Sequence, residues 1–169
     1  SWLRPANVKG SALGKYLLAE CFLFGKWVPR NPETAVSLLG DASEMEKPGR
    51  ALDLLATCYH KGWGVEANPA EAVRLYQAAC DEGFYNAYAN LGVLYMKGEG
   101  VERSPTRAVR LFRDGAEEGN GQCMYFYAAA HQDGLGVERD RAAARTWFGR
   151  AAEAGNSRAI AWLRENGGN

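Results

Sequence analysis

Few residues of this chain have both the type and the spacing that catalysis requires. Cys58 and His60 form the nearest thiol and imidazole pair, but residues two positions apart do not face each other on a helix. Glu117 and Glu118 are adjacent carboxylates at a predicted turn, without an apolar pocket that would raise the pKa of one of them for acid catalysis. We therefore predict no catalytic residues and expect that the chain is not an enzyme.

Glycine pairs of the form Gly-x-Gly-Val resemble phosphate-binding loops, and they recur every 36 residues. A phosphate-binding loop follows a strand and carries a third glycine, and a single cofactor site would not recur in the same role. We interpret the pairs as tight turns between helices that need positive φ. A fixed period of this length is typical of stacked repeat proteins, which usually present binding surfaces. The turn glycines are Gly62, Gly64, Gly98, Gly100, Gly134 and Gly136.

Four cysteines raise the question of disulfides and metal ions. Cys21 and Cys58 hold equivalent places in successive repeats, and neighbouring equivalent helices of a stack lie about 10 Å apart. A disulfide needs Cα atoms closer than about 7 Å, so we expect these two residues to be buried free thiols. There is no CxxC motif and the two histidines are far apart, so the sequence predicts neither a metal site nor a cofactor.

Helical patterns flank every glycine pair. A first helix precedes the pair, and a second helix follows it with apolar residues at i, i+3, i+4 and i+7. Asn31, Asn68 and Ser104 stand before prolines, and Asp140 takes the same place in the last repeat, which predicts four helix N-caps. No alternating apolar pattern predicts a strand. The expected helices lie at roughly 8–24, 32–44, 49–61, 69–82, 86–97, 105–118, 122–133, 141–154 and 157–166.

The predicted fold class is therefore all-α, a right-handed superhelical solenoid of antiparallel helix pairs with a closing C-terminal helix. We expect one domain over residues 1–169, in which the first repeat is a degraded copy of the others. The repeats are predicted at about 8–44, 49–82, 86–118 and 122–154, and the closing helix at 157–166.

Composition limits the kinds of partner. Twenty basic and twenty acidic residues balance to zero net charge, whereas nucleic-acid binding needs a concentrated positive field. Arginines 103, 107, 110 and 113 gather near one helix, and we interpret them as a solvated outer face.

No segment approaches the roughly 18 apolar residues of a membrane span. The chain begins with Ser1 rather than Met, which indicates a processed or excised fragment.

The Gly-x-Gly-Val loop, the Ala-x-x-Leu-Tyr or Ala-x-x-Leu-Phe second helix and the Glu-Gly turn together resemble the Sel-1-like repeat family, a relative of the tetratricopeptide repeats. The similarity is strongest over residues 50–160. It implies the solenoid fold. Four unpaired thiols favour a reducing compartment, whereas the habits of bacterial members and the missing Met favour export, so the periplasm is slightly favoured over the cytoplasm. The clearest copy comprises Ala87, Leu91, Gly92, Tyr95, Gly98, Gly100, Val101, Ala108, Leu111, Phe112, Ala116 and Gly119.

The cysteine-rich bacterial branch of this family ties each repeat with a disulfide. Here Cys80 occupies one of the two cysteine places, but its counterpart is Ala87. Cys123 occupies the other place, and its counterpart is Ala116. The resemblance therefore extends neither to those disulfides nor to the penicillin binding of that branch.

A partner is expected to bind on the first helices, which line the concave side in solenoids of this kind. Their positions not needed for packing mix aromatic, methionine and charged side chains, as protein interfaces do. We expect Tyr125, Met96 and Tyr16 to be the anchors. The predicted groove residues are Tyr16, Glu20, Leu23, Phe24, Arg50, Asp53, Thr57, His60, Lys61, Asn86, Ala89, Val93, Met96, Lys97, Gln122, Tyr125, Ala129, Gln132 and Asp133.

The predicted function is non-catalytic protein recognition, as an adaptor, scaffold or inhibitor that binds a protein partner in the concave groove. One specific version is a bacterial immunity protein that blocks a secreted toxin. The alternative is a small-ligand-binding or hydrolytic protein that acts on cell-wall material. A deep closed pocket holding a titratable residue favours the alternative, and a shallow open groove favours the adaptor. No pattern in the sequence sets the oligomeric state.

Overall fold

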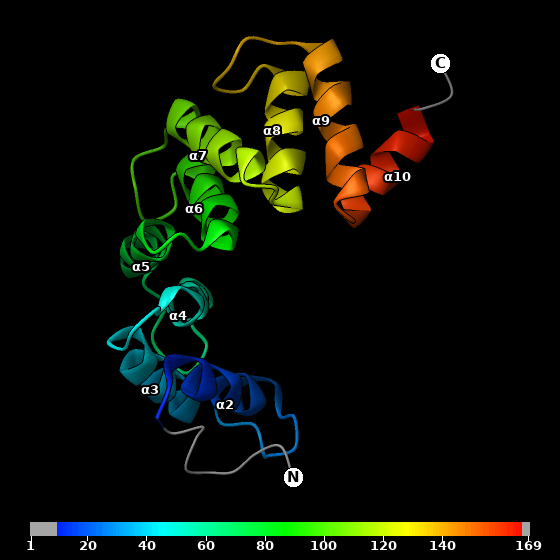
Figure 1. Ribbon diagram of the computed structural model, residues 1–169. Helices are drawn as coiled ribbons and strands as arrows, with labels where there is room; N and C mark the ends of the chain where they lie inside the picture. The colour runs from blue at the N-terminus through cyan, green and yellow to red at the C-terminus, as the bar shows by residue number, and fades with distance from the viewer. Residues whose placement is uncertain (1–9, 167–169) are drawn as a thin grey trace. The chain divides into compact units, whose positions relative to one another are not determined.

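The computed structural model describes residues 10–166, and every regular element in that range is a helix. The first helices of the four repeats are α2, α4, α6 and α8, and the second helices are α3, α5, α7 and α9 (Figure 1). The last helix, α10, follows the fourth repeat and is the closing helix. The predicted all-α fold of antiparallel helix pairs is confirmed. The helices are α2 (Ala12–Phe24), α3 (Pro32–Ser43), α4 (Gly49–Lys61), α5 (Pro69–Asp81), α6 (Tyr85–Lys97), α7 (Pro105–Glu117), α8 (Gly121–Asp133), α9 (Arg141–Glu153) and α10 (Ser157–Asn166).

The start of α2 differs from the prediction. Ser11 is its N-cap, and the Ser11 hydroxyl accepts a hydrogen bond from the Gly14 N–H, so the helix begins at Ala12 rather than at residue 8. Residues 8 and 9 of the predicted helix lie outside the described residues.

The predicted N-caps of the second helices are confirmed. The Asn31, Asn68 and Ser104 side chains each accept a hydrogen bond from the backbone N–H three residues later. The proline that follows each cap loses no hydrogen bond, because the first N–H groups of a helix have no partner inside it. Asp140 caps α9 through the N–H groups of Ala142 and Ala143.

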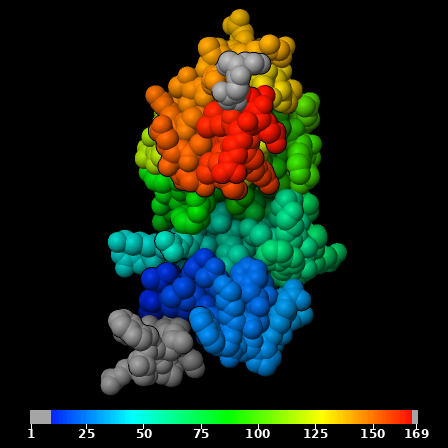
Figure 2. All heavy atoms as spheres, turned by 90° about the vertical axis from the view of Figure 1, so that its right-hand side faces the viewer, coloured from blue at the N-terminus to red at the C-terminus, as the bar shows by residue number. Residues whose placement is uncertain are grey.

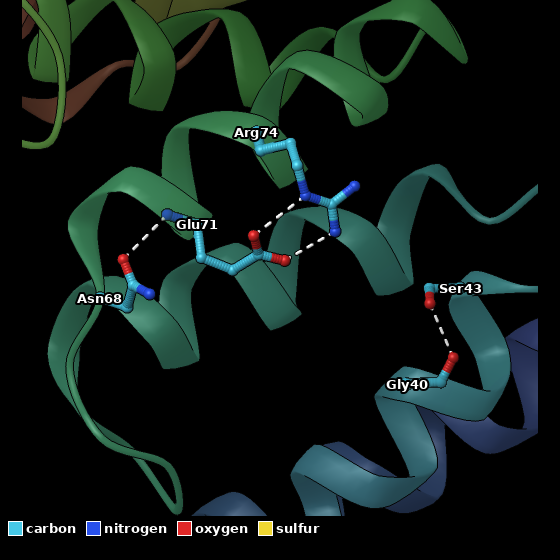
Figure 3. A network of polar contacts seen from close by, with 5 residues as sticks. All are labelled: Gly40, Ser43, Asn68, Glu71 and Arg74. Atoms are coloured by element: carbon cyan, nitrogen blue, oxygen red, sulfur yellow. Dashed lines mark hydrogen bonds and ion pairs between the residues drawn. The ribbon is translucent and has the colours of Figure 1, made fainter.

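One of these caps continues into an ion pair on the outside of its helix. Asn68 binds the N–H of Glu71, and the Glu71 carboxylate takes two hydrogen bonds from the Arg74 guanidinium at 2.6 and 2.9 Å (Figure 3). The hydrogen bond and charge of Arg74 lower the pKa of Glu71. Because both side chains lie on the surface, we expect the pair to add little to stability.

The described helices form two compact units, and repeats 1 and 2 lie in the first, Ser1–Phe84. Within unit 1, α2 packs against α3 and α4, and α4 packs against α5. Fully buried alanines such as Ala19, Ala35 and Ala56 occupy the contacts, and their small side chains let the helices approach closely. Thr57 of α4 shares a 2.9 Å hydrogen bond with the hydroxyl of the buried Tyr76 of α5.

Repeats 3 and 4 and α10 form unit 2, Tyr85–Asn169. Phe112 of α7 and Phe148 of α9 are its largest fully buried side chains. Phe112 stacks on Phe126 of α8, and Phe148 stacks on Trp162 of α10, with ring centroids 5.1 and 4.1 Å apart. The closing helix therefore covers α9, as the red and orange spheres of Figure 2 show.

The turn glycines take the predicted left-handed conformation, with φ between 70° and 77°. The second glycine of a pair also has a packing role. A Cβ on Gly64 would lie 2.3 Å from the backbone carbonyl atoms of Pro32, and a Cβ on Gly136 would lie 2.4 Å from those of Pro105. The loop of one repeat thus rests directly on the start of the preceding second helix, which the sequence did not show.

The cysteines are free thiols, but their burial differs from the prediction. Cys58 is fully buried as expected, whereas Cys21 is only half-buried. Burial raises the pKa of the Cys58 thiol to about 11 and that of the buried Cys123 to about 12. These two thiols therefore pack as small apolar groups and stay protonated at neutral pH.

Candidate functional site

The predicted groove residues fall into separate groups within each of the two units. In unit 1, Tyr16 of α2 and Arg50 of α4 line one open hollow of about 480 Å³, together with Lys47, Glu82 and Phe84. Burial, a hydrogen bond to Glu20 and the nearby carboxylate charges raise the pKa of Tyr16 to about 12. This hollow combines an apolar floor with charges of both signs.

Other predicted residues of unit 1 do not join that hollow. Thr57 is occupied by its hydrogen bonds to Tyr76 and to the carbonyl of Asp53. Phe24 is half exposed, and its ring meets Trp63 edge-on with centroids 6.3 Å apart. Lys61 is exposed and His60 is half-buried.

In unit 2 the structure brings five predicted residues together. Val93, Met96 and Lys97 of α6 face Ala129 and Asp133 of α8 across a hollow of about 200 Å³. We call this the apolar hollow. Its remaining lining residues are Phe112, Phe126, Ala130 and Leu135.

The lining of the apolar hollow is made by the packing of two repeats. Phe112 and Phe126 form its floor because they stack on each other between α7 and α8. Gly92 is needed beneath them, since a Cβ there would lie 2.3 Å from the Phe112 ring. Leu135 stands at the rim with 42% of its surface exposed, and Lys97 and Asp133 supply charges of opposite sign.

A second hollow of unit 2, of about 380 Å³, begins at Asp133, which also lines the apolar hollow. We call it the arginine hollow, because three arginines stand around it. Arg139 is held in place by a 3.0 Å hydrogen bond from its Nε to the carbonyl of Gln132. The lining comprises Gln132, Asp133, Arg139, Arg141, Ala144, Arg145, Trp162 and Asn166.

Predicted residues near the start of the unit 2 first helices lie elsewhere. Asn86 of α6 and Gln122 of α8 line a polar hollow of about 340 Å³. Each is bonded to an asparagine, Asn86 to Asn120 at 2.6 Å and Gln122 to Asn156 at 3.5 Å. They are therefore not part of either hollow described above.

Three predicted groove residues serve packing instead. Leu23 and Ala89 are each only 2% exposed and belong to the core, so their assignment to the groove was wrong. Tyr125, a predicted anchor, is half-buried between Phe126 and Phe148, with the Arg158 guanidinium 5.9 Å from its ring. Tyr125 lines neither hollow, so the structure does not bring it together with Met96.

The four arginines that the sequence grouped are all exposed, and three of them have contacts of their own. Arg103 lies in a loop, and its Nε donates to the carbonyl of Met96 at the end of α6. Arg30 and Arg139 make the same bond to the carbonyl seven residues earlier. Arg113 pairs with Asp114, and Arg107 lies 5.8 Å from the Tyr95 ring. Arg103 therefore also secures the end of α6.

The residues that sequence reasoning missed are the floor of the apolar hollow and the arginines beyond it. The 36-residue register was the available signal. A step of 36 residues makes Trp162 the equivalent of Phe126 and Arg139 the equivalent of Arg103. A hollow found in one repeat therefore predicts a hollow in the next.

Within residues 10–166, no helix is long and apolar enough to cross a membrane. In the same part of the chain, no three side chains of His, Cys, Asp or Glu come together as metal ligands would.

Comparison with known proteins gives the same account of the fold. Residues 12–46, 49–84, 86–120 and 121–156 match the model of the Sel1 repeat. A Sel1 repeat protein from Oxalobacter formigenes is 30% identical, with a TM-score of 0.83, over 92% of this chain and 63% of that one. The uropathogenic Escherichia coli protein c5321, a protective antigen displaying an SLR fold, is 29% identical, with a TM-score of 0.84, over 97% and 36%.

A third structure shares the fold alone. Cysteine rich protein B of Helicobacter pylori is 15% identical, with a TM-score of 0.54, over 96% of this chain and 98% of that one. This chain spans less than two thirds of the length of the O. formigenes and E. coli proteins.

Proposed function

Because this chain belongs to the Sel1 repeat family, whose repeats generally serve as protein–protein interaction modules, we propose that it is a non-catalytic module that binds a protein partner on its first-helix face. The observation that carries the proposal is the apolar hollow of unit 2. Several predicted groove residues meet there, and the hollow opens to solvent beside charged residues. An aromatic or aliphatic side chain of a partner would cover apolar surface that water otherwise contacts.

The shape of the hollows supports recognition over chemistry. Each hollow described above opens to solvent, and the apolar hollow has two phenylalanines as its floor, with Lys97 and Asp133 as the ionisable residues of its lining. Interfaces of this kind depend on a few well-packed anchors within a polar frame. We propose Met96 and Val93 as the anchors in unit 2, with Lys97 and Asp133 as the polar frame.

The test uses two leucines of similar exposure. Leu135, 42% exposed, lines the apolar hollow, whereas Leu17 of α2, 45% exposed, lines none of the hollows described here. A partner is captured from the cells of origin with the wild-type chain, and its affinity is then measured with purified proteins. We expect Leu135→Ser to weaken binding about tenfold or more, on hot-spot precedent, and Leu17→Ser to leave it unchanged.

Equal affinity of the two variants for the partner would move the site away from the apolar hollow. Circular dichroism of both variants checks that their helical content is kept. In the inhibitor form of the proposal, the partner is a secreted toxin. Wild-type chain then suppresses the toxic activity in a mixing assay, and Leu135→Ser does so only at higher concentration.

A further inference from the structure

We propose that the segment recognised by unit 2 is an extended acidic peptide, with an apolar side chain in the apolar hollow and a carboxylate about three residues away in the arginine hollow. This rests on the proposed function and specifies the chemistry of the ligand. The two hollows share Asp133, so they adjoin each other on one unit.

The hollows are the same structural position in consecutive repeats. A step of 36 residues takes Met96 to Gln132, Phe126 to Trp162 and Ala130 to Asn166. The backbone frame is thus repeated, while the chemistry changes from apolar to polar. A chain lying across both would meet an apolar site and then a polar site.

The charge of the second hollow favours an anionic side chain. Arg139, Arg141 and Arg145 contribute three positive charges to its lining, against the single carboxylate of Asp133. The bond from Arg139 to the Gln132 carbonyl fixes its guanidinium at the hollow. Guanidinium groups bind carboxylates through paired hydrogen bonds, which suits a glutamate or aspartate.

One polar atom of the arginine hollow lacks a hydrogen-bond partner. The Gln132 side-chain oxygen is buried and has no hydrogen-bond partner within the described residues. A buried polar atom without a partner costs free energy, so a ligand that supplies one is favoured. The oxygen is enclosed by the protein, so a peptide N–H in the hollow can donate to it only after the Gln132 side chain rotates toward the ligand.

The spacing follows from the stacking of the repeats. The first helices α6 and α8 pack directly, and packed helices lie about 8–10 Å apart. An extended chain advances about 3.3 Å per residue, so about three residues lead from one hollow to the next. Trp162 offers an aromatic surface beside the arginines, and its ring is held by stacking on Phe148.

The experiment measures fluorescence anisotropy with labelled, N-acetylated and C-amidated peptides. One pair of peptides carries a leucine and a glutamate three positions apart, in either order, within a serine and glycine sequence. In the matched peptides, glutamine replaces glutamate. We expect one glutamate peptide to bind at least about fivefold more tightly than its glutamine counterpart, and this preference to shrink with added salt because the charges are near the surface.

Variants locate the preference. Arg141→Gln combined with Arg145→Gln should abolish the preference for glutamate. The matched control, Arg74→Gln with Arg110→Gln, removes two exposed arginines that line neither hollow and should keep it. Retained preference in the first variant, or equal binding of glutamate and glutamine peptides by the wild type, would overturn the proposal.

The peptide experiment and the partner-capture experiment can fail independently of each other. If both kinds of peptide bind equally and Leu135→Ser weakens both, unit 2 still recognises proteins and only the acidic chemistry is wrong. If no peptide binds, the acidic-peptide proposal fails, while partner capture judges the proposed function independently.

Discussion

Replacing Gly136 by alanine tests whether the second glycine of each pair is required by stacking as well as by its turn. Gly136 has φ 76°, and an added Cβ would lie 2.4 Å from the carbonyl carbon and oxygen of Pro105 and 2.9 Å from the Thr106 nitrogen. These are backbone atoms at the start of α7, which cannot turn aside as a side chain can. Gly155 is the matched control, because its φ is 82° and a Cβ there would meet nothing within 4 Å.

The two substitutions share one cost and differ in the other. A left-handed conformation costs a residue other than glycine about 1–2 kcal/mol, and this applies to both positions. At Gly136 the overlap with α7 adds an overpacking cost of about 1–3 kcal/mol. We therefore expect Gly136→Ala to lower the free energy of unfolding by about 2–5 kcal/mol, and Gly155→Ala by about 1–2 kcal/mol.

Urea unfolding followed by circular dichroism at 222 nm measures both values, and the slope with denaturant checks that the transition keeps its character. Equal losses at Gly136 and Gly155 would refute the packing role and leave turn geometry as the whole reason for the glycine. A loss at Gly136 smaller than that at Gly155 would show that the loop does not rest on Pro105.

Two further predictions concern the first repeat and the thiols. Trp27 stands where later repeats have the second glycine, with φ 62° and 88% exposure, so Trp27→Gly should raise the free energy of unfolding by about 1 kcal/mol in the same urea assay. A loss of stability would show that the Trp27 ring has a packing role. Native Cys21 should react with iodoacetamide at pH 8 well before Cys58 or Cys123, because burial raises their pKa values to about 11 and 12. Both thiols ionise at lower pH in the unfolded chain than in the folded one, so the stability that their burial contributes is full below pH 9 and is lost as pH rises through 11–12. Equal iodoacetamide labelling of the three cysteines would contradict the expected protection of Cys58 and Cys123.

The fold was predictable because its signals repeat. Each cap at Asn31, Asn68 or Ser104 combines a side-chain acceptor with a following proline, and the chemistry of a helix start leaves few other interpretations. The start of α2 was predicted too early because no proline follows its N-cap, Ser11. The apolar pattern of the sequence also extends to the N-terminal side of Ser11, where it resembles a continuing helix.

The candidate site was only partly predictable, because exposure depends on packing between helices. Met96 and Val93 were predicted to lie on a binding face from their position in the period, and the structure brings both to one hollow. Ala89 has a similar place in the period but is buried, since Ala116 and Cys123 pack around it. Tyr125 was chosen for its residue type, yet it packs in one cluster with Phe148 of α9 and Trp162 of the closing helix α10.

Side chains that differ between equivalent positions of two repeats therefore determine which ligand each repeat can bind. Ala108 and Ala144 are both buried and equivalent, so they maintain the same helix contact in repeats 3 and 4. Met96 and Gln132 are also equivalent, but one lines an apolar hollow and the other a hollow with three arginines. Because the backbone frame is kept while these side chains change, adjoining repeats offer an apolar hollow and an arginine-lined hollow without any new fold element.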